Sequence, residues 1–306
     1  MLQKLTLHIG LHKTGSTTIQ AWLKKIRGQL VAQGTLYPET GCPHSIPEGQ
    51  HDLARSIKGH QAVKQSVDAI WRSLAIEVAS AQPQHLLISS EDFSVLTQEQ
   101  VCEVASRLPS AKQICIALYI RKAERLLASA FRQHVVVHRR AITPDGFVEE
   151  QLERVDYLKI LKRWAHVFGD ECISVRVLDA AIAGHGLLRD FQELAHIDSV
   201  MTEGLSARNT SEEVGVIDNI LLINKLTHTR FGRCIPDKVI NRIRRSVLKK
   251  GAWGRAISML PRARLTRQIF GDDCIRRIRK YSAECNRGLE AYVPQEHLHF
   301  LGLERA

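Results

Sequence analysis

The residues best suited to chemistry lie in a short polar segment near the N-terminus. Residues 10–18 read Gly-Leu-His-Lys-Thr-Gly-Ser-Thr-Thr and follow the apolar run from Leu5 to Ile9, which is typical of a strand. Apolar residues at helical spacing begin at Ile19, so we expect the segment between a strand and a helix N-terminus. Glycines there let the backbone approach a ligand, and the N–H groups and the helix dipole favour an anion. The segment predicts a binding loop for a phosphate-like group.

The spacing of this loop differs from that of the nucleoside-triphosphate-binding loop G-x-x-x-x-G-K-[ST]. Gly10 and Gly15 have the required separation, but Ser16 occupies the position of the lysine. The lysine of this chain, Lys13, lies inside the loop, and the Lys-Ser/Thr pair that holds magnesium is missing. This arrangement argues against an ordinary ATPase or kinase.

The segment from His12 to Thr18 resembles the 5′-phosphosulfate-binding loop of sulfotransferases that use 3′-phosphoadenosine 5′-phosphosulfate (PAPS) as donor. A second segment resembles their 3′-phosphate motif, because Arg121 follows the apolar run from Ile114 to Ile120 and Ser129 lies eight residues later. Arginine offers a forked donor that suits phosphate, and a serine hydroxyl adds a second bond. The resemblance implies that the donor is bound by His12, Lys13, Thr14, Gly15, Ser16, Thr17, Thr18, Arg121 and Ser129.

The resemblance also implies how catalysis would work. Sulfuryl transfer is an in-line displacement, so we expect catalysis mainly by positioning and charge stabilisation, with Lys13 at the leaving oxygen and no metal required. The attacking hydroxyl needs a proton acceptor, for which two candidates stay open. His51 follows an irregular segment after Tyr37-Pro38, as in bacterial members, and histidine titrates near neutral pH. Glu91 follows the predicted strand Leu86 to Ser89, where burial is expected to raise the pKa of its carboxyl.

Three late residues are secondary candidates for the 3′-phosphate. In the family a basic loop that contains glycine closes over this group, and Lys250 and Gly251 would supply it here, with Arg208 as the other option. The chain departs from many cytosolic members at the adenine, because Ile19 rather than tryptophan follows Thr18.

The elements that must position these residues alternate between strands and helices. Strands are predicted over 5–9, 86–89, 114–120 and 173–178, with helical patterns between them, one of them over 62–81. This alternation predicts right-handed crossovers and a mainly parallel sheet that binds ligands at the carboxyl ends of its strands. We predict an α/β fold of the P-loop sulfotransferase type in a single domain. It comprises an α/β core over 1–205 and a basic, mostly helical C-terminal extension over 206–306.

Composition and charge restrict the class of protein. The 306 residues include 43 Lys+Arg against 32 Asp+Glu, and 44% are hydrophobic, as in soluble globular proteins. Residues 231–306 hold 17 Lys+Arg against 7 Asp+Glu, a net charge of +10, with clusters such as Arg242 to Arg245. These clusters predict either solvated faces of amphipathic helices or contact with a polyanion, such as an acidic glycan or a membrane surface. No motif for specific nucleic-acid readout is present.

Further patterns bear on location and metal binding. Apolar runs are strand-sized, and residues 1–10 lack the apolar core of a secretory signal, so we expect a cytoplasmic protein. The seven cysteines are scattered and form no C-x-x-C pair, so neither a disulfide framework nor a zinc site is predicted.

The sequence therefore predicts a PAPS-dependent sulfotransferase that acts on a hydroxyl of a carbohydrate or glycolipid. One alternative is a nucleotide or small-molecule kinase with an atypical phosphate loop. The other is a binding module that senses nucleotides or polyanions and has no enzymatic activity.

Overall fold

The computed structural model describes residues 2–198, 214–227, 236–248 and 269–303. The described residues divide into two compact units. The first unit comprises residues 1–122, 156–208 and 285–306, and the second comprises residues 123–155 and 209–284. No helix among the described residues is both long and apolar enough to cross a membrane.

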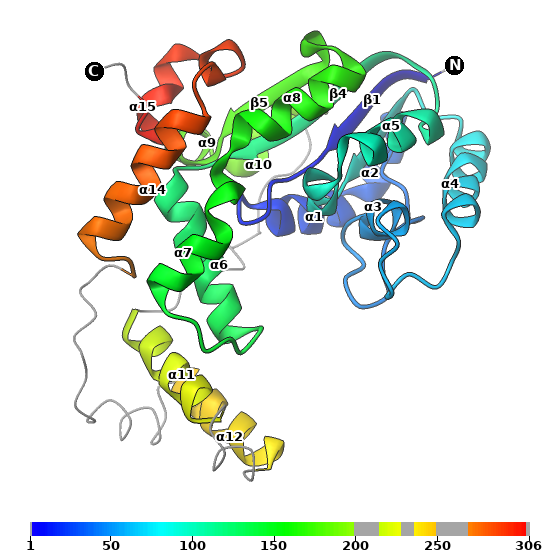
Figure 1. The fold of residues 1–306 in the computed structure, drawn as a ribbon. Helices are drawn as coiled ribbons and strands as arrows, with labels where there is room; N and C mark the ends of the chain where they lie inside the picture. Colours follow the sequence, from blue (N-terminus) through cyan, green and yellow to red (C-terminus); the bar gives the residue numbers. More distant parts are fainter. Residues whose placement is uncertain (1, 199–213, 228–235, 249–268, 304–306) are drawn as a thin grey trace. The chain divides into compact units, whose positions relative to one another are not determined.

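A five-stranded parallel sheet forms the centre of the first unit (Figure 1). Its strands are β1 (Leu2–His8), β2 (Thr35–Leu36), β3 (His85–Ser89), β4 (Ala111–Ile120) and β5 (Ile173–Val177). This sheet confirms the prediction of an α/β fold, and all four predicted strands are present. β2 was not predicted, because two residues are too few to show a strand period.

The strand order places the end of β1 where the connections change from one side of the sheet to the other. The order is β2-β3-β1-β4-β5, so β1 lies in the middle of the sheet. The chain leaves β1 for the β2 edge, returns through β3, and then crosses to β4 and β5 on the other side. Parallel sheets bind ligands where the order reverses in this way, at the carboxyl ends of the strands. The polar segment 10–18 follows β1 at this point.

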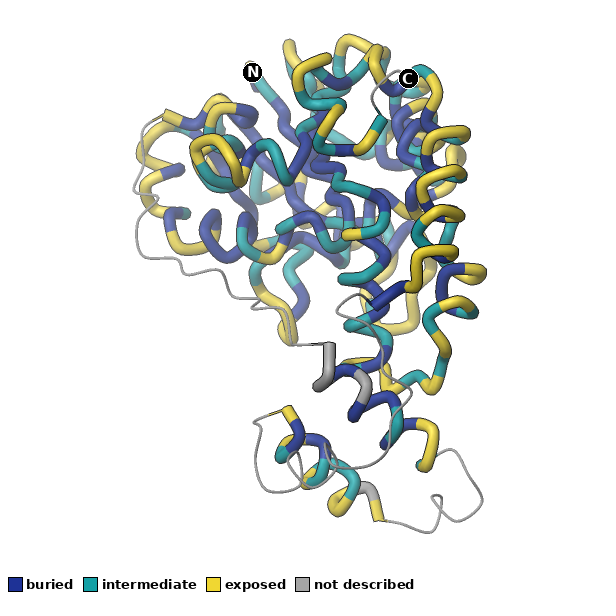
Figure 2. Tube along the Cα trace, turned by 90° about the vertical axis from the view of Figure 1, so that its left-hand side faces the viewer, coloured by how far each residue is buried: buried dark blue, intermediate teal, exposed yellow. Residues whose placement is uncertain are grey.

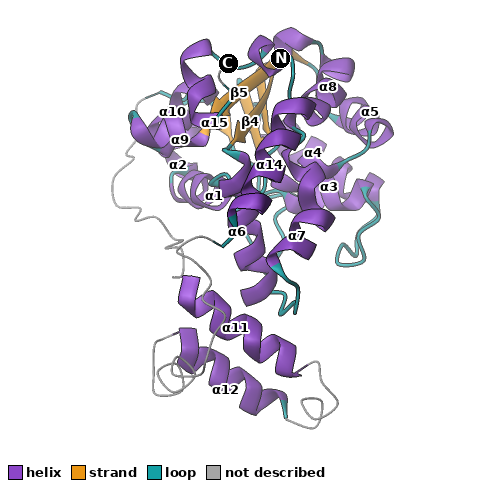
Figure 3. Cartoon of the chain, turned by 60° about the vertical axis from the view of Figure 1, so that its left-hand side comes forward, coloured by secondary structure: helices purple, strands orange, loops and turns teal. Residues whose placement is uncertain are grey.

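Helices cover both faces of this sheet (Figure 3). One face is covered by α1 (Ser16–Lys25), α2 (Arg27–Ala32), α9 (Leu178–Ala183) and α10 (Leu187–Ala195). The other face is covered by α3 (His51–Ile57), α4 (Val67–Ala81), α5 (Gln98–Arg107) and α8 (Tyr157–Phe168). The helix predicted over 62–81 is confirmed from Val67, where Ser66 caps its N-terminus by accepting a hydrogen bond from the Ala69 N–H.

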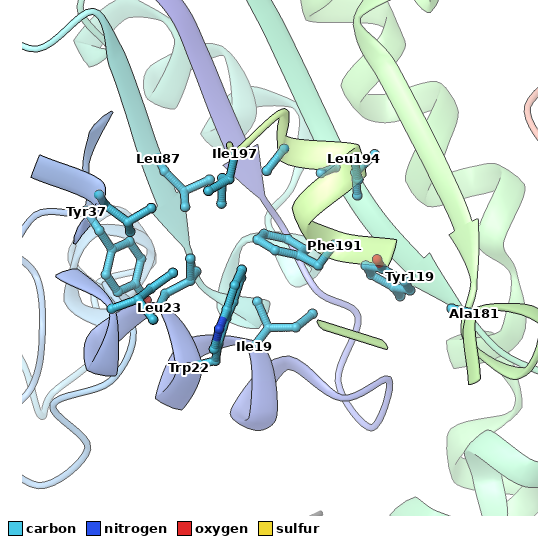
Figure 4. Close-up of a cluster of buried hydrophobic side chains, with 14 of the residues drawn as sticks. Ile19, Trp22, Leu23, Tyr37, Leu87, Tyr119, Ala181, Phe191, Leu194 and Ile197 are labelled. Atoms are coloured by element: carbon cyan, nitrogen blue, oxygen red, sulfur yellow. The ribbon is translucent and has the colours of Figure 1, made fainter. Parts of the chain in front are cut away.

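Aromatic side chains fill the space between α1, α10 and the sheet (Figure 4). Trp22 of α1 and Phe191 of α10 meet edge to face with ring centroids 6.4 Å apart, and Tyr119 of β4 lies 6.4 Å from the same phenylalanine ring. All three side chains are fully buried. Burial of such large rings is among the strongest contributions to core stability. The core therefore fixes α1, and with it the loop that precedes α1, against the sheet.

Buried residues lie mostly in the interior, whereas exposed residues lie mostly on the outer turns of the chain (Figure 2). Every residue of β3 is buried, as expected for a parallel sheet that is covered on both faces. The chain also returns to this unit near its C-terminus, where the Asn286 side-chain oxygen accepts a hydrogen bond from the Leu158 N–H at 3.1 Å. The short helical segments Leu289–Ala291, Gln295–His297 and Leu298–Leu301 (α15) follow.

The second unit is helical. It contains α6 (Ala123–Val136), α7 (Pro144–Gln151), the 3-10 helix Leu152–Val155, α11 (Val214–Thr227), α12 (Asp237–Leu248) and α14 (Asp272–Cys285). Arg244 is buried rather than solvated: its guanidinium donates to the Val136 carbonyl at 2.6 Å and also to the Asn224 side-chain oxygen. The prediction that the cluster from Arg242 to Arg245 lies on a surface face is wrong for Arg244. This side chain caps the carbonyls at the end of α6 instead.

Candidate functional site

The loop between β1 and α1 is tied to the end of β4. The Tyr119 N–H donates to the Gly10 carbonyl at 2.8 Å, and the Leu11 N–H donates to the Tyr119 carbonyl at 3.2 Å. Inside the loop, the Thr14 and Ser16 hydroxyls donate to the Leu11 carbonyl at 2.7 Å and 3.0 Å. Both side chains are buried, so these hydroxyls shape the loop.

The N-terminus of α1 offers backbone donors. Gly15 precedes the helix with φ 91°, and no side chain caps it. The Thr18 N–H donates back to the Gly15 carbonyl at 2.9 Å, whereas within the described part of the chain the N–H groups of Ser16 and Thr17 have no acceptor. Uncapped N–H groups together with the helix dipole are typical of an anion-binding N-terminus. The loop segment identified in the sequence thus has the donors that a phosphate or sulfate group would use.

Arg121 lies beside this loop. It follows β4, and its Nη1 lies 3.5 Å from the Lys13 carbonyl. The buried Tyr157 of α8 fixes its backbone, because the Tyr157 hydroxyl donates to the Arg121 carbonyl at 2.5 Å. Lys13 itself has a positive φ of 69° and a half-buried side chain. The two sequence motifs therefore meet at one edge of the sheet, although Lys13 and Arg121 are 108 positions apart in the chain.

The two base candidates also lie together at this edge. His51 is the first residue of α3 and is buried, with Nδ1 2.9 Å from the Ser90 hydroxyl oxygen and 3.9 Å from Oε2 of Glu91. Glu91 follows β3 and begins a 3-10 helix, Glu91–Val95. Nε2 of His51 has no hydrogen-bond partner among the residues that the structure describes. The sequence left these residues as alternatives, and the structure makes them neighbours.

Glu91 is held as a carboxylate. Burial alone would raise the pKa of this carboxyl, but the nearby His51 and His12 and a hydrogen bond from Gln20 outweigh burial and lower it. The Gln20 side-chain amide donates to Oε2 of Glu91 at 2.8 Å. The prediction that the pKa of Glu91 is raised is therefore wrong, because several favourable neighbours outweigh the effect of burial.

Gly10 makes the approach of Glu91 possible. Its φ is 111°, and a Cβ atom at this position would lie 2.9 Å from Cβ and 3.0 Å from Cα of Glu91. A residue with a side chain would thus meet backbone and side-chain atoms that cannot easily move. The first glycine of the loop is therefore required by the packing of the β1 and β3 ends.

Asp92 adds a second carboxylate that sequence analysis did not identify. Arg55 of α3 donates to it at 2.6 Å, and Nε2 of His12 lies 3.6 Å from its other oxygen. His12 thus faces the acidic residues after β3, and its predicted contact with the donor stays a prediction. The signal in the sequence was the position of Asp92 next to Glu91, at the end of a predicted strand.

Two buried glutamines position the site and were also missed. Gln50 accepts a hydrogen bond from the Ser89 N–H at 2.8 Å and donates to the Pro38 carbonyl at 2.7 Å, so it ties segment 37–50 to the end of β3. Gln20 lies one helical turn after Ser16, which places it on the side of α1 that begins in the loop. That spacing could have identified Gln20, whereas nothing in the irregular segment distinguishes Gln50.

The other predicted donor-binding residues stay predictions. Ser129 belongs to α6 in the second unit, and its role stays a prediction. Arg208, Lys250 and Gly251 lie outside the described residues.

The basic C-terminal quarter is partly neutralised within the second unit. Three arginines of α14 form ion pairs there: Arg276 with Asp273, Arg277 with Glu149, and Arg279 with Glu124. On α12, by contrast, Lys238, Arg242 and Arg245 are exposed, and no described residue pairs with them.

Within the described ranges, no group of three or more His, Cys, Asp or Glu side chains is placed to hold a metal ion. Comparisons with protein-family models, with curated proteins and with solved structures find no significant match to this chain.

Proposed function

We propose that this chain is a PAPS-dependent sulfotransferase that transfers a sulfuryl group to a hydroxyl of a carbohydrate or glycolipid. The main support is one juxtaposition: the Arg121 guanidinium contacts the Lys13 carbonyl, beside an uncapped helix N-terminus at the point where the strand order reverses. The strand order and the loop also support a fold of the P-loop sulfotransferase type.

The loop has the groups that the anionic donor needs. The N–H groups of Ser16 and Thr17 would hold its 5′ end, and Lys13 would stabilise the negative charge that grows on the leaving oxygen. Arg121 would hold the 3′-phosphate through its forked donors. The Thr14 side chain would stabilise the loop, because its buried hydroxyl donates a hydrogen bond to the Leu11 carbonyl within the loop.

The acceptor side needs a group that removes a proton as the hydroxyl oxygen bonds to sulfur. His51 suits this role, because its Nε2 lacks a partner among the described residues while Nδ1 faces the Ser90 hydroxyl. Glu91, 3.9 Å from Nδ1, would stabilise the imidazolium that forms when His51 takes the proton. In this account the sulfur–oxygen bond to the leaving phosphate breaks, and the adenosine bisphosphate departs with its charge near Lys13.

The proposal is tested by incubating the protein with a panel of glycans and glycolipids and either ³⁵S-labelled PAPS or Mg²⁺ with γ-³²P-labelled ATP. We expect transfer of ³⁵S and no transfer of ³²P. Transfer of ³²P alone would establish the kinase alternative, and transfer of neither would contradict an enzymatic role on these acceptors.

The two acid-base residues have separable expected effects. His51→Ala should lower kcat by about 100-fold or more, since general-base catalysis contributes roughly 10²–10⁴-fold. Glu91→Gln keeps the shape of the side chain but removes its charge, so it should lower kcat less and shift the pH dependence of kcat. If His51→Ala retains near-normal kcat while Glu91→Gln does not, the assigned roles are reversed.

A further inference from the structure

A line of buried polar groups runs from the interior of the sheet to Glu91. It begins at His8, the last residue of β1, whose Nδ1 lies 2.8 Å from the Ser89 hydroxyl oxygen. The Gln20 side-chain amide lies 3.3 Å from the same hydroxyl and 2.8 Å from Oε2 of Glu91. His8, Ser89 and Gln20 are all at most 1% exposed, which is unusual for polar side chains outside a functional site.

The Glu91 carboxylate fixes the hydrogen-bond directions along this line. A carboxylate only accepts hydrogen bonds, so the Gln20 amide nitrogen donates to Glu91, and its second proton points to the Ser89 oxygen. The Ser89 oxygen therefore accepts from Gln20, and among the described residues its own proton has no acceptor other than His8 Nδ1. This direction satisfies the buried Ser89 hydroxyl and leaves His8 Nδ1 unprotonated, so a neutral His8 holds its proton on Nε2.

The surroundings of His8 agree with a neutral ring. Burial lowers the pKa of His8 to about 4, although Glu91 and a hydrogen bond with Gly10 act in the opposite direction. The ring lies edge to face against Phe191 at 5.2 Å and Tyr119 at 6.2 Å, and its Nε2 is buried. An aromatic wall of this kind excludes the water that would solvate an imidazolium.

Packing holds Gln20 in this position. A Cβ atom on Gly49 would lie 2.8 Å from the side-chain carbon Cδ of Gln20, so only glycine leaves room for the amide there. The backbone of the neighbouring residue Gln50 is bonded to the Ser89 carbonyl at 3.0 Å. The line of polar groups is therefore enclosed by α1, β3 and the segment that precedes α3.

We infer that Gln20 and Ser89 are positioning residues: with His8 as the terminal acceptor, they aim a hydrogen bond at Oε2 of Glu91, the oxygen that faces His51. This orientation is set by the hydrogen bonds among His8, Ser89, Gln20 and Glu91 and needs no ligand. Its consequence for catalysis rests on the proposed function, whereas the hydrogen-bond order itself does not.

The first test measures the order directly in the protein without ligand. Ring ¹⁵N chemical shifts of His8, assigned by comparison with His8→Gln, should show the neutral tautomer protonated on Nε2 from pH 7.5 down to pH near 5. A ring protonated on Nδ1 in this range, or one doubly protonated, would overturn the inference. This measurement needs neither a bound ligand nor an acceptor substrate.

The second test removes the hydrogen-bond donor of Gln20 and changes the shape of this side chain only a little. Gln20→Met, compared with Gln29→Met on the exposed surface of α2, should raise the titration midpoint of the Glu91 carboxyl carbon in ¹³C NMR spectra assigned with Glu91→Gln. The Gln29 variant should leave that midpoint unchanged. Equal midpoints in the wild type and in a folded Gln20→Met protein would contradict a positioning role.

The third test concerns catalysis. In Gln20→Met, kcat for sulfuryl transfer should fall about tenfold, with a shifted pH profile and an unchanged KM for the donor, because a hydrogen bond to a charged group is lost. A fall in kcat without any change in the pH profile would indicate a structural role only. If no sulfuryl transfer is found in the wild type, the proposed function fails, while the NMR results still decide the hydrogen-bond order.

Discussion

Gly10 allows the loop to pack closely against Glu91 at the end of β3. In Gly10→Ala, the new methyl group would enter the space of Glu91 Cβ and Cα, and alanine would have to adopt a φ of 111°. We expect a loss of roughly 2–4 kcal/mol in the free energy of unfolding. Denaturant titration measures this loss.

Gly28 provides the matched control. It lies in α2, and a Cβ atom added to it would meet no other atom within 4 Å, so Gly28→Ala should leave stability unchanged or raise it by up to about 1 kcal/mol. Equal unfolding midpoints for the two variants would show that Gly10 does not have the steric role described.

Two buried histidines make stability depend on pH. Burial lowers the pKa of both His8 and His85 from 6.5 to about 4. Between these values the unfolded chain binds protons that the folded chain does not, so stability is complete above pH 6.5 and falls as the pH falls toward 4. Each histidine contributes a slope of at most about 1.4 kcal/mol per pH unit in this window.

Denaturant unfolding between pH 7.5 and 4.5 measures this slope. His85→Gln should make the slope shallower than in the wild type, whereas His44→Gln, at an exposed position, should not change it. A slope in His85→Gln equal to that of the wild type would mean that this histidine is not buried in its neutral form.

At the scale of elements, the Gln50 side chain ties segment 37–50 to the end of β3. Gln50→Leu would leave the buried Ser89 N–H without its partner and would remove the 2.7 Å hydrogen bond to the Pro38 carbonyl, which Arg27 Nη2 also contacts at 3.3 Å. An unsatisfied buried group costs about 1–3 kcal/mol, so we expect a loss of that size in the free energy of unfolding and faster proteolysis within 43–49. Gln29→Leu on exposed α2 is the control, and identical digestion of both variants would contradict this role.

Much of the sheet could be predicted, because β1, β3, β4 and β5 are apolar runs bounded by polar or glycine-containing segments. β2 could not be predicted, since it is defined only by pairing with β3 after a turn at Gly34. The loop and Arg121 were predicted from spacing. The direction in which the pKa of Glu91 shifts was not, because it depends on side chains from two distant segments, the loop with α1 and the start of α3.

At the scale of the whole molecule, only part of the positive charge of the C-terminal quarter lies on exposed side chains that could contact a partner. Periodicity predicted the helices of this region but could not show that Arg244 is buried while Arg242 and Arg245 are exposed. A buried guanidinium that bonds carbonyls leaves no signal in a helical pattern, because it occupies a position that an apolar residue would also suit. The prediction of contact with an anionic surface therefore applies to α12 rather than to α14.

Vesicle sedimentation and heparin binding test this prediction. At low salt, Arg242→Gln with Arg245→Gln should weaken binding to phosphatidylserine vesicles about 30-fold, since each basic residue near such a surface contributes about 1 kcal/mol. Arg276→Gln with Arg279→Gln, which removes paired arginines, should have a smaller effect. Binding to heparin but not to vesicles would assign the surface to an acidic glycan, and binding to neither would contradict an anionic partner.

The proposed function requires that the loop of Lys13 and the guanidinium of Arg121 form one site for an adenosine bisphosphate. Isothermal titration calorimetry with 3′-phosphoadenosine 5′-phosphate in the presence of EDTA tests it most directly, with Mg²⁺-ATP titrated separately. We expect binding without metal that Arg121→Ala weakens by tenfold or more, that Lys13→Ala weakens less, and that Lys112→Ala, at an exposed position of β4, leaves unchanged. Absence of bisphosphate binding, together with tight binding of Mg²⁺-ATP, would contradict the account.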